Sequence, residues 1–135
     1  MDQEDNQAGR NRRRDARHAV DGPASLMLVH HGADIPCRLV DLSLGGCQIY
    51  AEKPFLAGPM VRVEVVFQVI GEAFRIAGVT QWTRGRQRVG VRFLDVSERK
   101  RNALMQLIKE IEEYNMRRAS ALQNAAAGSD TAENA

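Results

Sequence analysis

The 135-residue chain has few of the features that mark secreted or membrane-spanning proteins. Its two cysteines, Cys37 and Cys47, lack Cys-x-x-Cys spacing, so neither a disulfide-rich scaffold nor a structural zinc site is supported. Its apolar stretches are short and broken by charges, and its first residues are polar and rich in arginine. The sequence therefore predicts no membrane span and no secretory signal. The expected location is the cytoplasm, with both thiols reduced.

Aromatic residues and lysines are also scarce. Aromatic residues make up 5% of the chain, too few for the stacking surfaces by which small barrels bind single-stranded nucleic acid, so no nucleic-acid partner is expected. Of the 19 basic residues only Lys53, Lys100 and Lys109 are lysines. The others are arginines, whose planar fork holds phosphates and guanine edges through paired hydrogen bonds. GC-rich coding also favours arginine, so the number of arginines alone does not indicate phosphate or guanine binding. Their positions in the sequence have to distinguish the two explanations.

The length suits one domain, and a chain with 44% hydrophobic and 27% charged residues is typical of a globular protein. Residues 1–9 are polar and without periodicity, and they are predicted to form a disordered tail. Residues 10–17 hold five arginines against one aspartate and have no apolar face. They are therefore expected to be an exposed arm at the start of a domain that covers residues 10–113.

From residue 23 to residue 94 the hydrophobic pattern has a period of two, with frequent turn signals. Val63, Val65 and Phe67 fall on one face of the clearest segment, and Arg62 and Glu64 fall on the other. Strands are predicted over residues 25–29, 35–42, 47–51, 60–69, 74–82 and 88–93. Six short strands without intervening helices predict a mainly β fold, an antiparallel barrel or sandwich.

The period becomes helical after Asp95. Asp95 and Glu98 are predicted to form a capping box at the start of this helix. The apolar stripe that should pack on the barrel consists of Leu104, Leu107, Ile108 and Ile111. The stripe weakens afterwards, so residues 114–127 are predicted to be a helix extension that projects, frays or meets a partner such as a second copy of the chain. Gly128 predicts the end of the helix, followed by a disordered tail at 128–135.

Two short motifs carry the candidate chemistry. Residues 13–17 (RRDAR) form an R-x-x-x-R motif preceded by Arg12, and residues 41–46 (DLSLGG) form a D-x-S-x-x-G motif. Each motif is weak alone, but their order, their interval and the barrel predicted to follow make the pair specific. In this arrangement the sequence resembles the PilZ domain family, the bacterial receptors for the second messenger cyclic di-GMP. The resemblance extends from about residue 10 to residue 113.

The resemblance implies a six-stranded antiparallel PilZ-type β-barrel with a long C-terminal α-helix, which agrees with the pattern of the sequence. It also implies a receptor or adaptor whose arginine-rich arm becomes ordered on the ligand and changes the surface offered to an unidentified effector protein. The sequence contains no catalytic or metal-binding spacing. We therefore expect no enzymatic activity, no metal and no cofactor.

The chemistry of the motifs suits such a ligand. Asp41 and Ser43 are two residues apart near a predicted strand end, so they are expected to project from one face. The Asp41 carboxylate matches the N–H groups of a guanine edge, and the Ser43 hydroxyl can donate or accept. Gly45 and Gly46 permit positive φ and a close approach of the ligand to the backbone.

The resemblance assigns a role to each candidate residue. Arg13 and Arg17 match the arginines of the arm that contact the ligand, and in extended backbone they would lie about 13 Å apart. In the family, an arginine at the position of Arg12 accompanies two mutually intercalated cyclic di-GMP molecules, with Arg14 as an added contact. Trp82 either stacks on a guanine or covers the barrel. The complete candidate site is Arg12, Arg13, Arg14, Arg17, Asp41, Ser43, Gly45, Gly46 and Trp82.

Two other interpretations stay open. A PilZ-like barrel without nucleotide binding could act through protein contacts alone, with its long helix as the docking element. A basic barrel could also bind single-stranded nucleic acid, although no predicted strand carries the aromatic residues that such binding uses.

Overall fold

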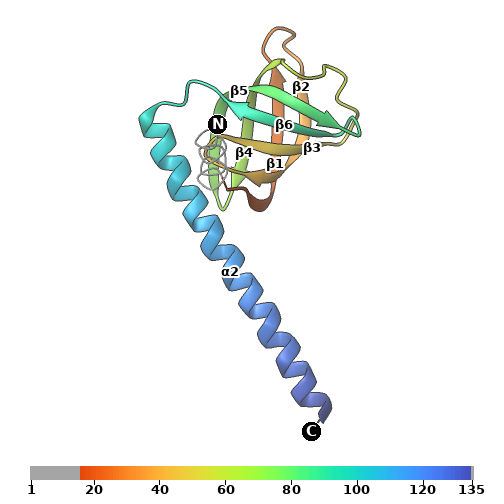
Figure 1. Ribbon diagram of the computed structural model, residues 1–135, viewed down its shortest axis with the longest axis vertical. Coiled ribbons are helices and arrows are strands. Elements are labelled where there is room, and N and C mark those ends of the chain that lie inside the picture. The colour runs from red at the N-terminus through yellow and green to blue at the C-terminus, as the bar shows by residue number, and fades with distance from the viewer. Residues whose placement is uncertain (1–15, 135) are drawn as a thin grey trace, which may run out of the picture.

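The computed structural model describes residues 16–134 (Figure 1). The predicted tail at residues 1–9 and most of the arginine arm, including Arg12, Arg13 and Arg14, lie outside the described residues. Within them, the strands are β1 (His18–Leu28), β2 (Asp34–Leu42), β3 (Gly46–Ala51), β4 (Arg62–Val69), β5 (Glu72–Arg84) and β6 (Arg88–Phe93), and the helix is α2 (Glu98–Asn134).

The six strands form a closed barrel in the order β1-β2-β3-β6-β5-β4. Every neighbouring pair is antiparallel, and β4 pairs back with β1 to close the barrel. Closure gives every strand two partners, so no strand edge is left unpaired. The predicted six-stranded antiparallel barrel with a C-terminal helix is therefore confirmed.

The core follows the period of two that the sequence shows. Along β4, Val63, Val65 and Phe67 are buried inside the barrel while Arg62 is exposed. The Phe67 ring stacks on Phe74 of β5, with 5.4 Å between the ring centroids.

Both cysteines belong to the core as free thiols. Burial, with smaller contributions from Asp34 and Glu52, raises the pKa of Cys37 to about 12. Burial also raises the pKa of Cys47. The two residues therefore serve as small apolar side chains, as the sequence predicts.

Only β6 has the predicted bounds, and the other strands differ from the prediction by one or two residues except at the start of β1. β1 begins at His18 rather than at residue 25, because its first half pairs with β2 across a register shift between Ala19 and Gly22. Such a shift interrupts the alternation that identifies a strand in a sequence.

The β4–β5 turn is formed by Ile70 and Gly71, both with positive φ, which is the conformation of a two-residue hairpin turn.

Helix α2 packs on the barrel with its first half only. The predicted stripe of Leu104, Leu107, Ile108 and Ile111 is buried, whereas Tyr114, Met116 and Leu122 are exposed. Figure 1 shows the corresponding arrangement, in which the helix leaves the barrel and its C-terminal half projects away from it. Although α2 is long, no helix among residues 16–134 is long and apolar enough to cross a membrane.

Both ends of α2 differ from the prediction. The N-cap is Ser97 rather than Asp95, since the Lys100 N–H donates to Ser97 Oγ at 3.1 Å and the helix begins at Glu98. Asp95 instead takes a positive φ of 51° in the preceding turn. At the other end, the helix continues through Gly128 to Asn134, so the predicted stop before residue 128 is wrong. One interior glycine costs a helix only about 1 kcal/mol relative to alanine, which does not force it to end.

Shortening Leu107 should destabilise the fold because this side chain is 1% exposed between helix and barrel. We expect Leu107→Ala to lower the free energy of unfolding by about 2–5 kcal/mol, from lost burial and the cavity left behind. Leu122, which is 63% exposed, is the matched control, and Leu122→Ala should change stability by less than about 0.5 kcal/mol. Chemical denaturation followed by circular dichroism measures both. Equal effects of the two variants would contradict the packing described here.

Candidate functional site

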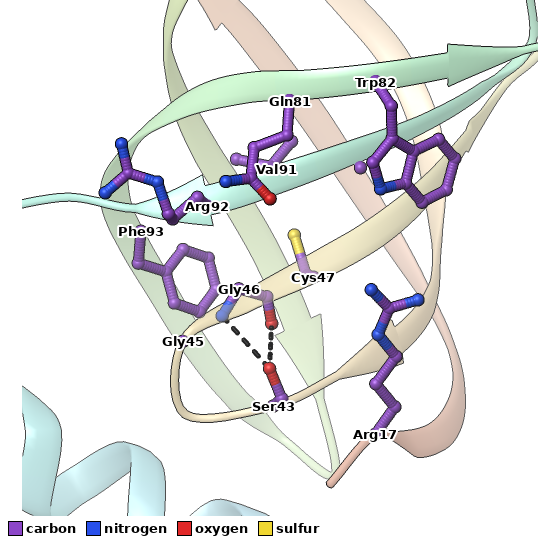
Figure 2. Close-up of a pocket in the computed structure, with 11 residues that line it drawn as sticks. Arg17, Ser43, Gly45, Gly46, Cys47, Gln81, Trp82, Val91, Arg92 and Phe93 are labelled. Atoms are coloured by element: carbon purple, nitrogen blue, oxygen red, sulfur yellow. Dashed lines mark hydrogen bonds between the residues drawn. The ribbon is translucent and has the colours of Figure 1, made fainter. Parts of the chain in front are cut away.

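A pocket of about 720 Å³ opens on the outer surface of β3, β6 and β5, with Arg17 at its border (Figure 2). In Figure 2 the Arg17 guanidinium lies on the same side of the pocket as the indole of Trp82. Glycines, which expose their backbone, line the pocket together with polar, apolar and aromatic side chains. The lining residues are Arg17, Ser43, Gly45, Gly46, Cys47, Gln81, Trp82, Gly90, Val91, Arg92 and Phe93. Five of the candidate residues from the sequence therefore meet in one place, namely Arg17, Ser43, Gly45, Gly46 and Trp82.

The corner between β2 and β3 is held by Ser43. Its hydroxyl donates to the Gly46 carbonyl and accepts from the Gly46 N–H, both at 3.1 Å. The Ser43 N–H also donates to the Gly46 carbonyl at 2.8 Å. These bonds fix the shape of the corner, so the hydroxyl is already engaged within the protein while Ser43 lines the pocket.

Gly46 of this corner is required by a close approach between strands. Neither Gly45 nor Gly46 has positive φ, so the left-handed backbone that a glycine permits is not used here. A Cβ at Gly46 would lie 2.1 Å from the Val91 carbonyl oxygen of β6. No real side chain tolerates that distance, and only glycine allows β3 to pair with β6 at this point.

Trp82 lies outside the core. Its indole lies against Gly90, where an added Cβ would come within 2.2 Å of the ring. The Arg84 guanidinium lies over the indole, 4.7 Å from the ring centroid, which is the geometry of a cation–π interaction. The tryptophan is half-buried and lines the pocket, so it is placed where an aromatic base can contact it.

Asp41 is close to the pocket but does not line it. With the Gln48 amide oriented to satisfy its neighbours, Gln48 Nε2 donates to Asp41 Oδ2 at 2.8 Å. Burial raises the pKa of the Asp41 carboxyl, while Arg17, the Gln48 backbone N–H and Arg88 act to lower it. The cationic groups therefore oppose the cost of burying the carboxylate. Ser43 lines the pocket and Asp41 does not, because β2 ends between them. Asp41 is hydrogen-bonded to Gln48, and Ser43 is hydrogen-bonded to Gly46.

Six residues of the pocket are missing from the sequence-based site, and two of them, Gln81 and Arg92, have polar side chains outside the core. Arg92 lies directly opposite Gly46 in the β3–β6 register, and period-two counting along β6 could have placed it there. Gln81 could not have been found in this way. A register shift between Thr80 and Trp82 brings both Gln81 and Trp82 to the pocket, whereas strict alternation puts neighbouring residues on opposite faces. Among residues 16–134 no cluster of potential ligands for a metal ion is present.

The chain is thus a closed antiparallel barrel with a C-terminal helix and a pocket lined by polar and apolar residues. The PilZ domain family model matches residues 11–110, and the chain belongs to this family. No curated protein matches the sequence.

Solved PilZ structures share the fold. The chain is similar to the PilZ domain of YcgR from Escherichia coli with c-di-GMP, at 22% identity and a TM-score of 0.65, over 81% of this chain and 98% of that one. It is also similar to YcgR in complex with c-di-GMP, at 22% identity and a TM-score of 0.68, over 82% of this chain and 50% of that one. The PilZ domain of CeSA from a cellulose-synthesizing bacterium matches at 18% identity and a TM-score of 0.58, over 71% and 97%.

A methyl group at Gly90 should displace the indole of Trp82, the only tryptophan of the chain. We expect Gly90→Ala to shift the tryptophan emission spectrum, because the ring loses its contact with the strand. Gly78→Ala is the matched control: its Cβ would meet Val91 and Arg92 rather than the indole, so it should lower stability without moving the emission. An unchanged spectrum in a folded Gly90→Ala variant would contradict the observed contact.

Proposed function

We propose that the chain is a receptor for cyclic di-GMP in the cytoplasm. The observation that carries this proposal is the convergence of Arg17, from the end of the arginine arm, with the Ser43–Gly46 corner at one pocket. Arg17 and Ser43 are 26 residues apart in the sequence, with Arg17 directly before β1 and Ser43 directly after β2. Their convergence supports a ligand that has both phosphates for arginines and base edges for the corner.

Two residues that line the pocket, Arg17 and Trp82, and Asp41 beside it have chemical roles in this proposal. Arg17 pairs with a phosphate or with the O6 and N7 acceptors of a guanine. Asp41 accepts hydrogen bonds from the N–H groups of a guanine edge. Trp82 offers its indole for base stacking, and such a stack is worth about 1–3 kcal/mol per base.

The rest of the arm completes the site in the proposal. Arg13 binds the ligand together with Arg17, while Arg12 and Arg14 contact a second, intercalated cyclic di-GMP molecule. The phosphates neutralise the clustered arginines, which removes the repulsion that opposes folding of the arm against the barrel. Ligand binding thus orders the arm and changes the surface that an effector protein meets.

Contacts between β1 and α2 support transmission from the arm to the helix. The Asn115 side chain donates to the Ala19 carbonyl at 3.0 Å. His18 Nε2 lies 3.4 Å from Glu112 Oε1. Since His18 directly follows Arg17, a movement of Arg17 toward the ligand acts on the residues that contact α2.

Removing either charged partner of the ligand should weaken binding. We expect Arg17→Ala and Asp41→Ala each to raise the Kd for cyclic di-GMP by more than tenfold, since each loses a charge-assisted contact of about 1.5–3 kcal/mol. Arg62→Ala is the control, because this exposed arginine lies on β4 and does not line the pocket. Isothermal titration calorimetry measures all three. Unchanged affinity in both site variants would remove the site assignment.

The same titration gives the stoichiometry. Two ligands per chain would agree with the role proposed for Arg12, and one ligand would contradict that role alone. A folded wild-type chain that ignores saturating cyclic di-GMP would instead favour an interaction module that binds no nucleotide.

The exposed half of α2 favours a protein contact as a second function. Tyr114 and Leu122 are eight residues apart and place two large apolar side chains near one face of the projecting segment, and we propose that a second copy of the chain covers them in a homodimer. Leu122→Glu should shift the chain toward monomer in sedimentation equilibrium. Leu56→Glu, at another highly exposed leucine in the β3–β4 loop, should leave the association unchanged. A wild-type chain that stays monomeric at high concentration would contradict the homodimer.

A further inference from the structure

Four residues from four neighbouring strands form one row across the outside of the barrel. Trp82 of β5 pairs with Gly90 of β6. Gly90 pairs in turn with Gln48 of β3, and Gln48 pairs with Asp41 of β2. The row therefore joins the tryptophan of the pocket to the carboxylate beside it, with a glycine and a glutamine between them.

Gln48 is an unusual residue for its position. It lies on the outer face of β3, yet it is only 7% exposed. A buried amide needs hydrogen-bond partners for both its oxygen and its nitrogen, because an unpaired polar group costs free energy when it leaves water. Its two partners are Arg88 of β6 and Asp41 of β2.

The chemistry of these partners leaves the amide one orientation. A guanidinium has only donors, and an ionised carboxylate has only acceptors. Gln48 Oε1 therefore accepts from Arg88 Nε at 3.2 Å, and Nε2 donates to Asp41 Oδ2 at 2.8 Å. In the reverse orientation a donor would face a donor and an acceptor would face an acceptor.

We propose that Gln48, oriented by Arg88, is a positioning residue that holds the Asp41 carboxylate toward the guanine edge of the ligand and so sets the preference for guanine over adenine. This inference rests on the proposed function of the pocket. Guanine presents two neighbouring N–H donors on its Watson–Crick edge, whereas adenine presents an acceptor beside its amino group. A carboxylate held ionised and in place by Gln48 suits the first edge and repels the second.

The charges around Asp41 agree with this role. Arg17 precedes β1, and Arg88 lies on β6; both lower the pKa of Asp41, while burial raises it. On β3 the Cys47 thiol lies close enough for Asp41 to contribute to its raised pKa. The Gln48 amide adds a hydrogen bond to the charged form of Asp41, so its loss should raise the pKa of Asp41 further.

The test compares Gln48→Leu with Gln68→Leu, the same change on an exposed glutamine of β4. In the ligand-free protein, NMR titration of the Asp41 carboxyl should show a higher pKa in Gln48→Leu and an unchanged one in Gln68→Leu. In calorimetry, Gln48→Leu should bind cyclic di-GMP about tenfold more weakly, and its preference over cyclic di-AMP should fall. Its affinity should also decline at a higher pH than that of the wild type as the solution is acidified.

Arg88→Gln provides a second variant that keeps the fold, because Arg88 is exposed. It should raise the pKa of Asp41 in any case, because Arg88 itself lowers that pKa, and it should lower the selectivity as Gln48→Leu does, since the amide then loses the guanidinium that orients it. Wild-type values of both quantities in Gln48→Leu and Arg88→Gln would overturn this inference while leaving the proposed function intact. Failure of the wild-type chain to bind cyclic di-GMP would overturn the proposed function, and the Asp41 titration would still decide whether Gln48 positions the carboxylate.

Discussion

The close pairing of β3 with β6 is the constraint on which the site depends. At Gly46 the two strands approach so closely that any side chain would collide with the Val91 carbonyl. This approach brings the β2–β3 corner beside β6, and the second glycine, Gly90, lets the indole of Trp82 lie against the same strand. The pocket is thus a product of two missing side chains, and the polar side chains of Arg17, Ser43, Gln81 and Arg92 line the space they leave.

The barrel could be predicted from the sequence because its strands obey one simple rule. Alternation along β4 and β6, together with the turn signals between segments, gives the number of strands and the inward faces. The alternation of inward and outward residues fails to predict the structure where the pairing between strands shifts in register. The shift at Thr80 and Trp82 brings two successive residues to the pocket, and the shift in β1 hides the first half of that strand. Neither shift has a signature in residue types alone.

The motifs predicted the site, but not the way its residues act. Arg17, Ser43 and Gly46 do meet, as their resemblance to PilZ motifs implies. The Ser43 hydroxyl nevertheless forms its hydrogen bonds with Gly46 inside the corner. Gly46 is needed for the close approach of β6 rather than for left-handed backbone. Gln48 was missed altogether, because a glutamine in a strand usually marks a solvent-exposed face. Its burial follows from neighbours on two other strands, which no local pattern reveals. The start of α2 was missed for a similar reason, since capping depends on one hydrogen bond that Ser97 Oγ accepts from the Lys100 N–H.

The buried thiols have a practical consequence for experiments. The thiolate is the reactive form of cysteine, and both Cys37 and Cys47 are enclosed in the core with raised pKa values. Because the chain has only these two, at 5% and 6% exposure, a cysteine introduced on its surface would react with a maleimide dye far faster than either of them in the folded state. The natural protein is therefore already suited to site-specific fluorescent labelling, without first removing its own cysteines.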